Sequence, residues 1–193
     1  MKKRQFLGAV AAAGALPSLC SAAAAKPERG PTLLTVTGAI AKSNRGSFDR
    51  VADQMMHRQH LSFDKAFTFD FAALTALPAV TIKPTLEYDA RQHTLKGPLL
   101  LDVLQASGAQ VGGSSKLVLR AVDGYAVAVA AARAKAQRYI VATHMDGAPM
   151  ALGGLGPLWV IYDADRVPEM ANRPVGERFS TCPWALYHID VQA

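Results

Sequence analysis

Apolar residues in this chain recur mostly at every second position, which is the spacing of a half-buried β-strand. About eight stretches show this alternation or a short continuous apolar run. They are residues 33–40, 67–71, 80–88, 117–122, 125–129, 139–143, 158–162 and 184–191. Pro84 lies inside one of them and places that strand at a sheet edge or a bulge, because proline cannot donate to a ladder.

Helical spacing is clear at only one place. Within residues 99–107, Leu100, Val103 and Leu104 stand three and four positions apart, and Gly108 follows where a C-terminal cap belongs. The sequence therefore predicts one firm helix there.

The remaining helical signals are short. Residues 72–77 and 130–138 predict one or two turns each, and residues 49–60 fit either a short helix or an ordered loop. Helices do not alternate with strands, which argues against a doubly wound parallel sheet. The pattern predicts a β-rich α+β fold with mixed sheets and few short helices.

Composition agrees with a folded domain. Of the 193 residues, 50% are hydrophobic and 19% charged, which excludes a disordered chain. The formal charge is +6, but residues 1–25 hold three positive charges and no acid, so the rest of the chain carries +3. This small excess does not predict a nucleic-acid partner.

The first residues have the layout of an export signal. Lys2, Lys3 and Arg4 precede an apolar stretch at residues 6–16, and small residues follow up to position 25. The apolar stretch is shorter than the roughly 20 residues needed to span a bilayer. We therefore predict a signal peptide at 1–25, a linker at 26–32 and a domain at 33–193. The mature protein is expected to be periplasmic or secreted, without a membrane span.

Two details bear on export. The run Lys3-Arg4-Gln5-Phe6-Leu7 resembles the twin-arginine pattern with its first arginine replaced, and an ordinary secretory signal remains the alternative. Once Cys20 has left with the signal, Cys182 is the only cysteine, so no internal disulfide is expected.

Four motifs, in order, carry a family resemblance. They are Gly97-x-Leu99-Leu100-x-Asp102-Val103-Leu104, then Asp123-Gly124-Tyr125, then Asp146-Gly147-x-Pro149 with Gly156-Pro157-Leu158-x-Val160, and finally Trp184-x-Leu186-x-x-Ile189-x-Val191. Together they resemble the sulfite-oxidase-like molybdopterin-binding domain, from about residue 33 to residue 191. The resemblance implies that family's fold, with molybdopterin as a possible cofactor.

The family's chemistry depends on a cysteine at the end of a strand written roughly T-L-x-C, whose thiolate binds molybdenum. The matching stretch here is Thr85-Leu86-Glu87-Tyr88, so Tyr88 stands at the cysteine position. Cys182 is far away along the sequence. The chain therefore resembles small exported members without the metal-ligating cysteine, and we predict no metal ligand. His57 and His60 fit a solvated segment better than a metal site, because no third ligand is near.

The candidate site is the pocket left around this position. Glu87 and Tyr88 would shape it, Tyr125 would lie at its rim, and His144 would face it from a strand end. The alternatives are that Tyr88 packs as an ordinary strand residue and that His144 bonds to its own turn. We assign no catalytic residue.

Three functions remain open. The favoured one is a binding or sensing module for a small ligand or a periplasmic partner protein. The second is a molybdopterin-dependent oxidoreductase, or a subunit of one, with the cofactor held without a protein thiolate. The third is a structural protein whose cavity is filled.

Overall fold

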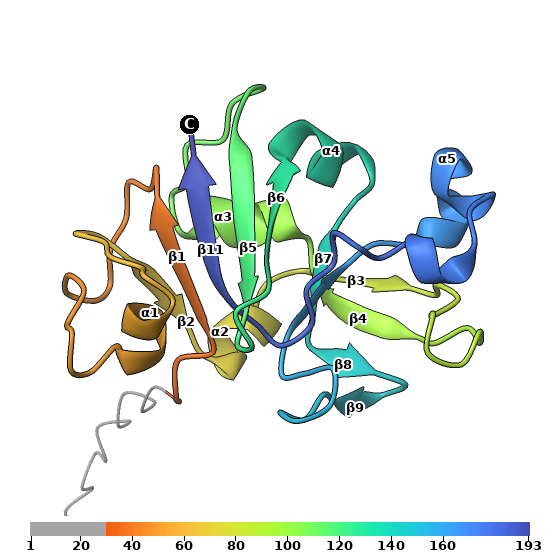
Figure 1. Cartoon of the computed structure of the whole chain (residues 1–193), viewed down its shortest axis with the longest axis horizontal. Coiled ribbons are helices and arrows are strands. Elements are labelled where there is room, and N and C mark those ends of the chain that lie inside the picture. Colours follow the sequence, from red (N-terminus) through yellow and green to blue (C-terminus); the bar gives the residue numbers. More distant parts are fainter. Residues whose placement is uncertain (1–29) are drawn as a thin grey trace, which may run out of the picture.

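The computed structural model describes residues 30–193, and the predicted signal peptide lies outside the described residues. The fold is α+β and rich in strands, with only short helices (Figure 1). One strand pair is parallel and the others are antiparallel, so the sheets are mixed, as predicted. Within the described part of the chain, no helix has the length and apolar character needed to cross a bilayer.

The largest sheet has five strands in the order β2-β1-β11-β5-β6. The last strand of the chain lies between the first strand and β5, parallel to β1 and antiparallel to β5. The beginning and the end of the domain are therefore bonded side by side (Figure 1). The strands are β1 (Leu34–Gly38), β2 (Phe67–Phe69), β5 (Lys116–Ala121), β6 (Ala126–Ala130) and β11 (Leu186–Gln192).

Two smaller sheets complete the strands. A four-stranded sheet has the order β3-β4-β8-β9, and β10 pairs with β7 in a two-stranded sheet. Figure 1 shows the four-stranded sheet and β7 beside the five-stranded sheet. Their strands are β3 (Ala79–Ile82), β4 (Leu95–Pro98), β7 (Ile140–Ala142), β8 (His144–Met145), β9 (Ala148–Pro149) and β10 (Trp159–Ile161).

The helices are all short. Among residues 30–193, five are α-helical and two are 3-10 helices. They are α1 (Gln54–Arg58), α2 (Phe71–Thr75), α3 (Leu100–Ala106), α4 (Ala131–Ala136) and α5 (Pro168–Ala171), with η1 (Ala164–Arg166) and η2 (Val175–Glu177) on either side of α5.

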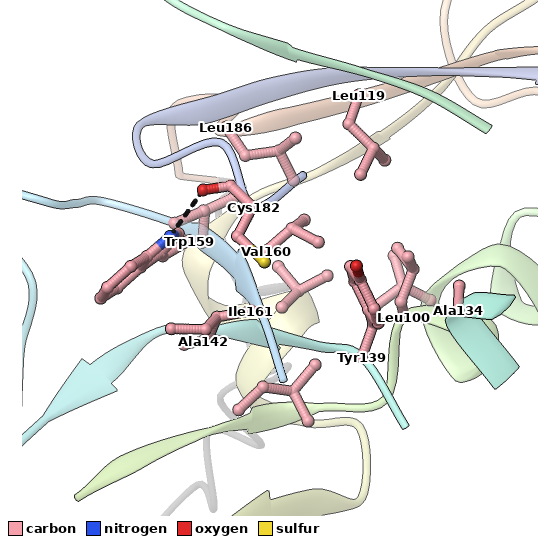
Figure 2. Close-up of a cluster of buried hydrophobic side chains, with 14 of the residues drawn as sticks. Leu100, Leu119, Ala134, Tyr139, Ala142, Trp159, Val160, Ile161, Cys182 and Leu186 are labelled. Carbon is pink, nitrogen blue, oxygen red and sulfur yellow. Dashed lines mark hydrogen bonds between the residues drawn. The ribbon is translucent and has the colours of Figure 1, made fainter. Parts of the chain in front are cut away.

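The main hydrophobic cluster is made of side chains from both the sheets and the helices. In α3 the residues with helical spacing, Leu100, Val103 and Leu104, are all buried in the main hydrophobic cluster. Figure 2 shows part of this cluster, where side chains from α3, β5, β7, β10 and β11 meet. Gly97 allows β4 to approach β7, because a Cβ there would lie 1.9 Å from the carbonyl oxygen of Val141.

Several boundaries differ from the predicted ones. The strand expected at 80–88 ends at Ile82, and the chain after Pro84 forms a turn, so Tyr88 is not in a strand. Phe71 begins α2 instead of continuing β2, because the Asp70 carboxylate caps the helix by accepting from the Ala73 amide at 2.7 Å. Strand β4 was not predicted, because Lys96 and Gly97 interrupt the apolar pattern.

Candidate functional site

A cavity of about 270 Å³ lies where three segments of the chain meet. These segments are the turn at 85–91, the β5–β6 turn, and residues 179–184, which precede β11. The fold brings together three of the predicted site residues, Glu87, Tyr88 and Tyr125. It adds Asp123, Cys182 and Trp184, which the sequence did not assign to the site.

A larger hollow of about 410 Å³ lies between α3, α4 and residues 109–113. Only Gln105 and Lys135 bring polar side chains to it, whereas several polar and aromatic groups converge on the cavity at Tyr88. Convergent polar groups in an apolar hollow are the usual mark of a ligand site. We therefore treat the smaller cavity as the candidate site.

The turn that carries Tyr88 is held by the buried side chain of Leu86 and by two backbone hydrogen bonds. Leu86 is buried, and its amide donates to the carbonyl of Arg91 at 2.9 Å, while the Ala90 amide donates to the Leu86 carbonyl at 3.0 Å. These bonds close the turn, and Glu87 and Tyr88 lie on its exposed side. Tyr88 is 55% exposed, so it is not the packed strand residue that was the alternative interpretation.

Asp165 in η1 joins two walls of the cavity. One carboxylate oxygen accepts from both the amide and the hydroxyl of Thr85, each at 2.8 Å. The other accepts from the Arg178 guanidinium at 2.7 Å, directly before the 179–184 segment. Charge-assisted bonds of this kind are stronger than neutral ones. The Asp165 carboxylate therefore fixes the position of the Tyr88 turn relative to the 179–184 segment.

His93 fastens the other end of the Tyr88 turn. Its ring nitrogens lie 2.7 Å from a carboxylate oxygen of Asp146 and 3.0 Å from one of Asp89. Hydrogen bonds to Asp146 and then Asp89 raise the pKa of His93, and the same contacts lower the pKa of each carboxyl. The turn is therefore tied to the β8–β9 hairpin by an arrangement that is strongest when His93 is protonated.

The β5–β6 turn supplies the second wall. Gly124 has φ +94°, and the Asp123 carboxylate accepts from the Tyr125 amide at 2.9 Å. The Tyr125 hydroxyl donates to the carbonyl of Ser180 at 2.5 Å, which connects this turn to the third wall. The turn chemistry predicted from Asp123-Gly124 thus also positions Tyr125 at the rim.

Cys182 is close to Tyr88 in space although it is far away in sequence. It belongs to the cavity wall, yet it is only 4% exposed, and Figure 2 shows its sulfur among the buried side chains of the main cluster. Its carbonyl accepts from the Trp159 indole at 2.9 Å. Burial raises the pKa of the thiol to about 12. At neutral pH it is therefore a protonated thiol, whereas the thiolate is the form that binds metals.

The cavity has acidic and aromatic character. Within residues 30–193, the residues that line it include the carboxylates of Glu87 and Asp123 but no Lys, Arg or His. Burial, followed by the charge of Glu87, raises the pKa of Tyr88 to about 12, so Tyr88 remains a phenol. A pterin phosphate would need cationic or N–H donors. This lining therefore does not fit a molybdopterin held by a thiolate.

His144 lies away from this cavity. It is in β8, which pairs with β4 in the four-stranded sheet, and it is not among the lining residues. Its Nδ1 is 2.8 Å from the Thr143 hydroxyl, and its ring packs 5.6 Å from the Phe71 ring. Although β8 shares a sheet with β3, which leads into the Tyr88 turn, the strand end that carries His144 does not line the cavity.

The His57 and His60 pair is split by the end of a helix. His57 is in α1, where its Nε2 accepts from Arg50, and His60 follows the helix with φ +58°. In the part of the chain that the structure describes, no three His, Cys, Asp or Glu residues are grouped as a metal site.

Sequence reasoning missed the residues that hold the walls of the site in place without lining the cavity. Asp165 and His93 act through contacts with residues 80 and 53 positions away, and no local pattern marks such pairs. Comparison with known protein families finds no family model that matches the chain, and comparison with curated proteins finds no match.

Proposed function

We propose that this protein is an exported domain of the sulfite-oxidase-like fold that lacks the metal-ligating cysteine and binds a small ligand as a binding or sensing module. The observation that carries the proposal is the cavity around Tyr88, into which Tyr125, Trp184 and two carboxylates also project polar or aromatic surface. The position that holds the metal in the family, according to the resemblance, is therefore the position of an open hollow.

The rigidity of the cavity supports a binding role. Its walls are connected to one another through Asp165 and the bond from Tyr125 to Ser180, and His93 ties the Tyr88 turn to the β8–β9 hairpin. A preorganised site loses less conformational entropy when it binds a ligand. A structural protein with a filled cavity would have no need of these contacts around an open hollow.

The test is analysis of the full chain purified from its native host. Native mass spectrometry should show a small bound molecule, and elemental analysis should show far less than one molybdenum per chain. Tyr88→Ala should lose the bound molecule, while Val51→Ala, which changes an exposed apolar residue outside the cavity, should retain it. A bound molecule that is unaffected by Tyr88→Ala would overturn the assignment of the site.

A molybdopterin-dependent oxidoreductase, or a subunit of one, with the cofactor held without a protein thiolate is the second candidate, and the open cavity at the position that the resemblance gives to the metal favours it. Stoichiometric molybdenum in the native protein would establish this candidate and overturn the first. Cys182→Ser then shows whether the sulfur matters, because a metal held without a protein thiolate would remain bound.

Export is tested separately. We expect the protein in the periplasmic or secreted fraction, processed near residue 25. Arg4→Lys removes the last arginine of the twin-arginine-like run. Unchanged export of this variant would assign the general secretory route, and loss of export would assign the twin-arginine route, which carries folded proteins and so supports the oxidoreductase.

A further inference from the structure

Three large aromatic side chains at the cavity are exposed to solvent. Tyr88 is 55% exposed, Tyr125 47% and Trp184 37%, although each stands beside buried structure. They come from three different segments of the chain, and all three line one hollow. Exposed aromatic faces gathered in a concave site are characteristic of ligand recognition, since isolated exposed rings would have no reason to converge.

Two carboxylates at the same cavity have no cationic partner in the part of the chain that the structure describes. Among residues 30–193, the ion pairs of the protein do not include Glu87 or Asp123. Asp123 uses one oxygen to accept from the Tyr125 amide, and the residue is exposed at the cavity. Since the lining contains no Lys, Arg or His, the charge within the cavity is negative.

Aromatic faces and carboxylates attract the same kind of ligand. The face of a Trp or Tyr ring carries negative potential and attracts cations, most strongly quaternary ammonium groups, while nearby carboxylates add long-range attraction. An anionic ligand would be repelled by both. The volume of about 270 Å³ suits one small group of this kind and falls below the roughly 300–1,000 Å³ of sites for drug-sized ligands.

We propose that this cavity binds a small organic cation, with a quaternary ammonium group held against Tyr88, Tyr125 and Trp184 and balanced by Glu87 and Asp123. This inference rests on the proposed binding function and specifies the class of its ligand. The walls fixed by Asp165 and by the Tyr125–Ser180 bond keep the rings in place before the ligand arrives.

Choline and its uncharged isostere 3,3-dimethyl-1-butanol provide the test. The two probes have the same shape and differ in the charged nitrogen, so a difference in affinity reports the charge. We expect titration calorimetry of the full mature chain to show choline binding about tenfold or more tightly than the alcohol, since a cation over aromatic rings gains about 1–2 kcal/mol. Trp184 is at the cavity, so its fluorescence should also change on binding.

Charge-removing variants assign the effect to the site. Glu87→Gln and Asp123→Asn should each weaken choline binding severalfold and leave binding of the alcohol unchanged. Asparagine can still accept from the Tyr125 amide, so the turn is retained. Glu177→Gln is the matched control, because it removes the same charge from an exposed glutamate outside the cavity. Trp184→Leu should weaken choline about tenfold.

The outcomes separate the two proposals. Equal affinity for both probes at the cavity would overturn the cation inference and leave the binding function standing. Preferential binding of inorganic phosphate would do the same. Failure of both probes to bind overturns the cation inference, and if the native protein also carries no small molecule, the proposed binding function falls with it.

Discussion

Two groups of aromatic side chains lie around residue 182 and serve opposite purposes. The inner group, Tyr139, Trp159 and Tyr162, is at most 1% exposed. The outer group, Tyr88, Tyr125 and Trp184, lines the cavity and is between 37% and 55% exposed. The same residue types thus form the interior on one side and the candidate site on the other.

The polar side-chain atoms of the inner group are all bonded within the protein. In the inner group each polar atom has a protein partner: the Tyr139 hydroxyl is 2.7 Å from the Thr181 hydroxyl, the Trp159 indole donates to Cys182, and the Tyr162 hydroxyl donates to Arg178 at 2.7 Å. A buried ring without such a partner would be costly. The outer rings can leave their faces free, because water or a ligand covers them.

The largest test of this contrast compares the two tryptophans. Trp159→Ala should lower the free energy of unfolding by about 3–5 kcal/mol, because it empties a buried site. Trp184→Ala should cost about 1 kcal/mol or less, because the side chain is partly exposed. Urea unfolding measures both. Similar losses for the two variants would mean that the outer ring is also a packing residue.

The interior should be sensitive to acid through His188. This side chain is 2% exposed, its Nε2 is 2.9 Å from the Thr37 hydroxyl, and its Nδ1 has no hydrogen-bond partner among the described residues. Burial, with the nearby Arg120 charge, lowers the pKa of His188 to about 4, against the opposing effect of Asp190. The folded protein therefore holds His188 neutral.

The direction in which stability changes with pH follows from proton uptake by His188. Between pH 6.5 and 4 the unfolded chain binds a proton at this histidine that the folded chain does not, so stability falls as pH falls, by up to about 3 kcal/mol. Urea midpoints across this range measure the effect. His188→Gln should flatten the curve in this window, and an unchanged curve would assign the acid sensitivity to other groups.

At the walls of the cavity, Asp165→Ala should have an intermediate effect. It leaves the Arg178 guanidinium and the Thr85 amide without their shared acceptor, at a cost of about 2 kcal/mol. Hydrogen exchange should accelerate in the 85–91 turn and around residue 178, while the β1–β11 pair stays protected. Asp64→Ala, at an exposed position, is the control and should change neither.

His93 should give the smallest effect and one of the opposite sign to His188. The pKa of His93 is raised in the folded state, so its contribution is fully present below the unfolded value and is lost as pH rises through the folded pKa. The protection factors of the 85–91 turn, which correct for the intrinsic rise of amide exchange with pH, should therefore fall modestly toward alkaline pH. His93→Gln should remove this dependence, and an NMR titration that finds an unshifted His93 would contradict it.

Much of the fold was predictable because it depends on local sequence patterns of apolar spacing and turn residues. The helix of Leu100, Val103 and Leu104, the turn at Asp123-Gly124 and the strands at both ends of the domain were all found from spacing and turn chemistry. The Tyr88 turn was not, because its apolar residues alternate as a strand would until Pro84 and the buried Leu86 redirect the chain.

The site was predictable only in part. Glu87, Tyr88 and Tyr125 were found and meet at one cavity, but His144 lies outside its lining, and Trp184 was assigned to a strand that begins two residues later. Whether an aromatic residue of this chain is buried or exposed is decided by neighbours far along the sequence, which a period of two or of 3.6 does not encode.

By itself the sequence determined the β-rich α+β class, the helix around Leu100, Val103 and Leu104 and the main turns, because each depends on residues close together in the chain. Only the tertiary structure decided that Cys182 lies in the same cavity wall as Tyr88 with its thiol buried, and that three exposed rings and the carboxylates of Glu87 and Asp123 share one hollow. Such placements depend on long-range pairing, above all of β11 between β1 and β5, which carries the 179–184 segment to the Tyr88 turn.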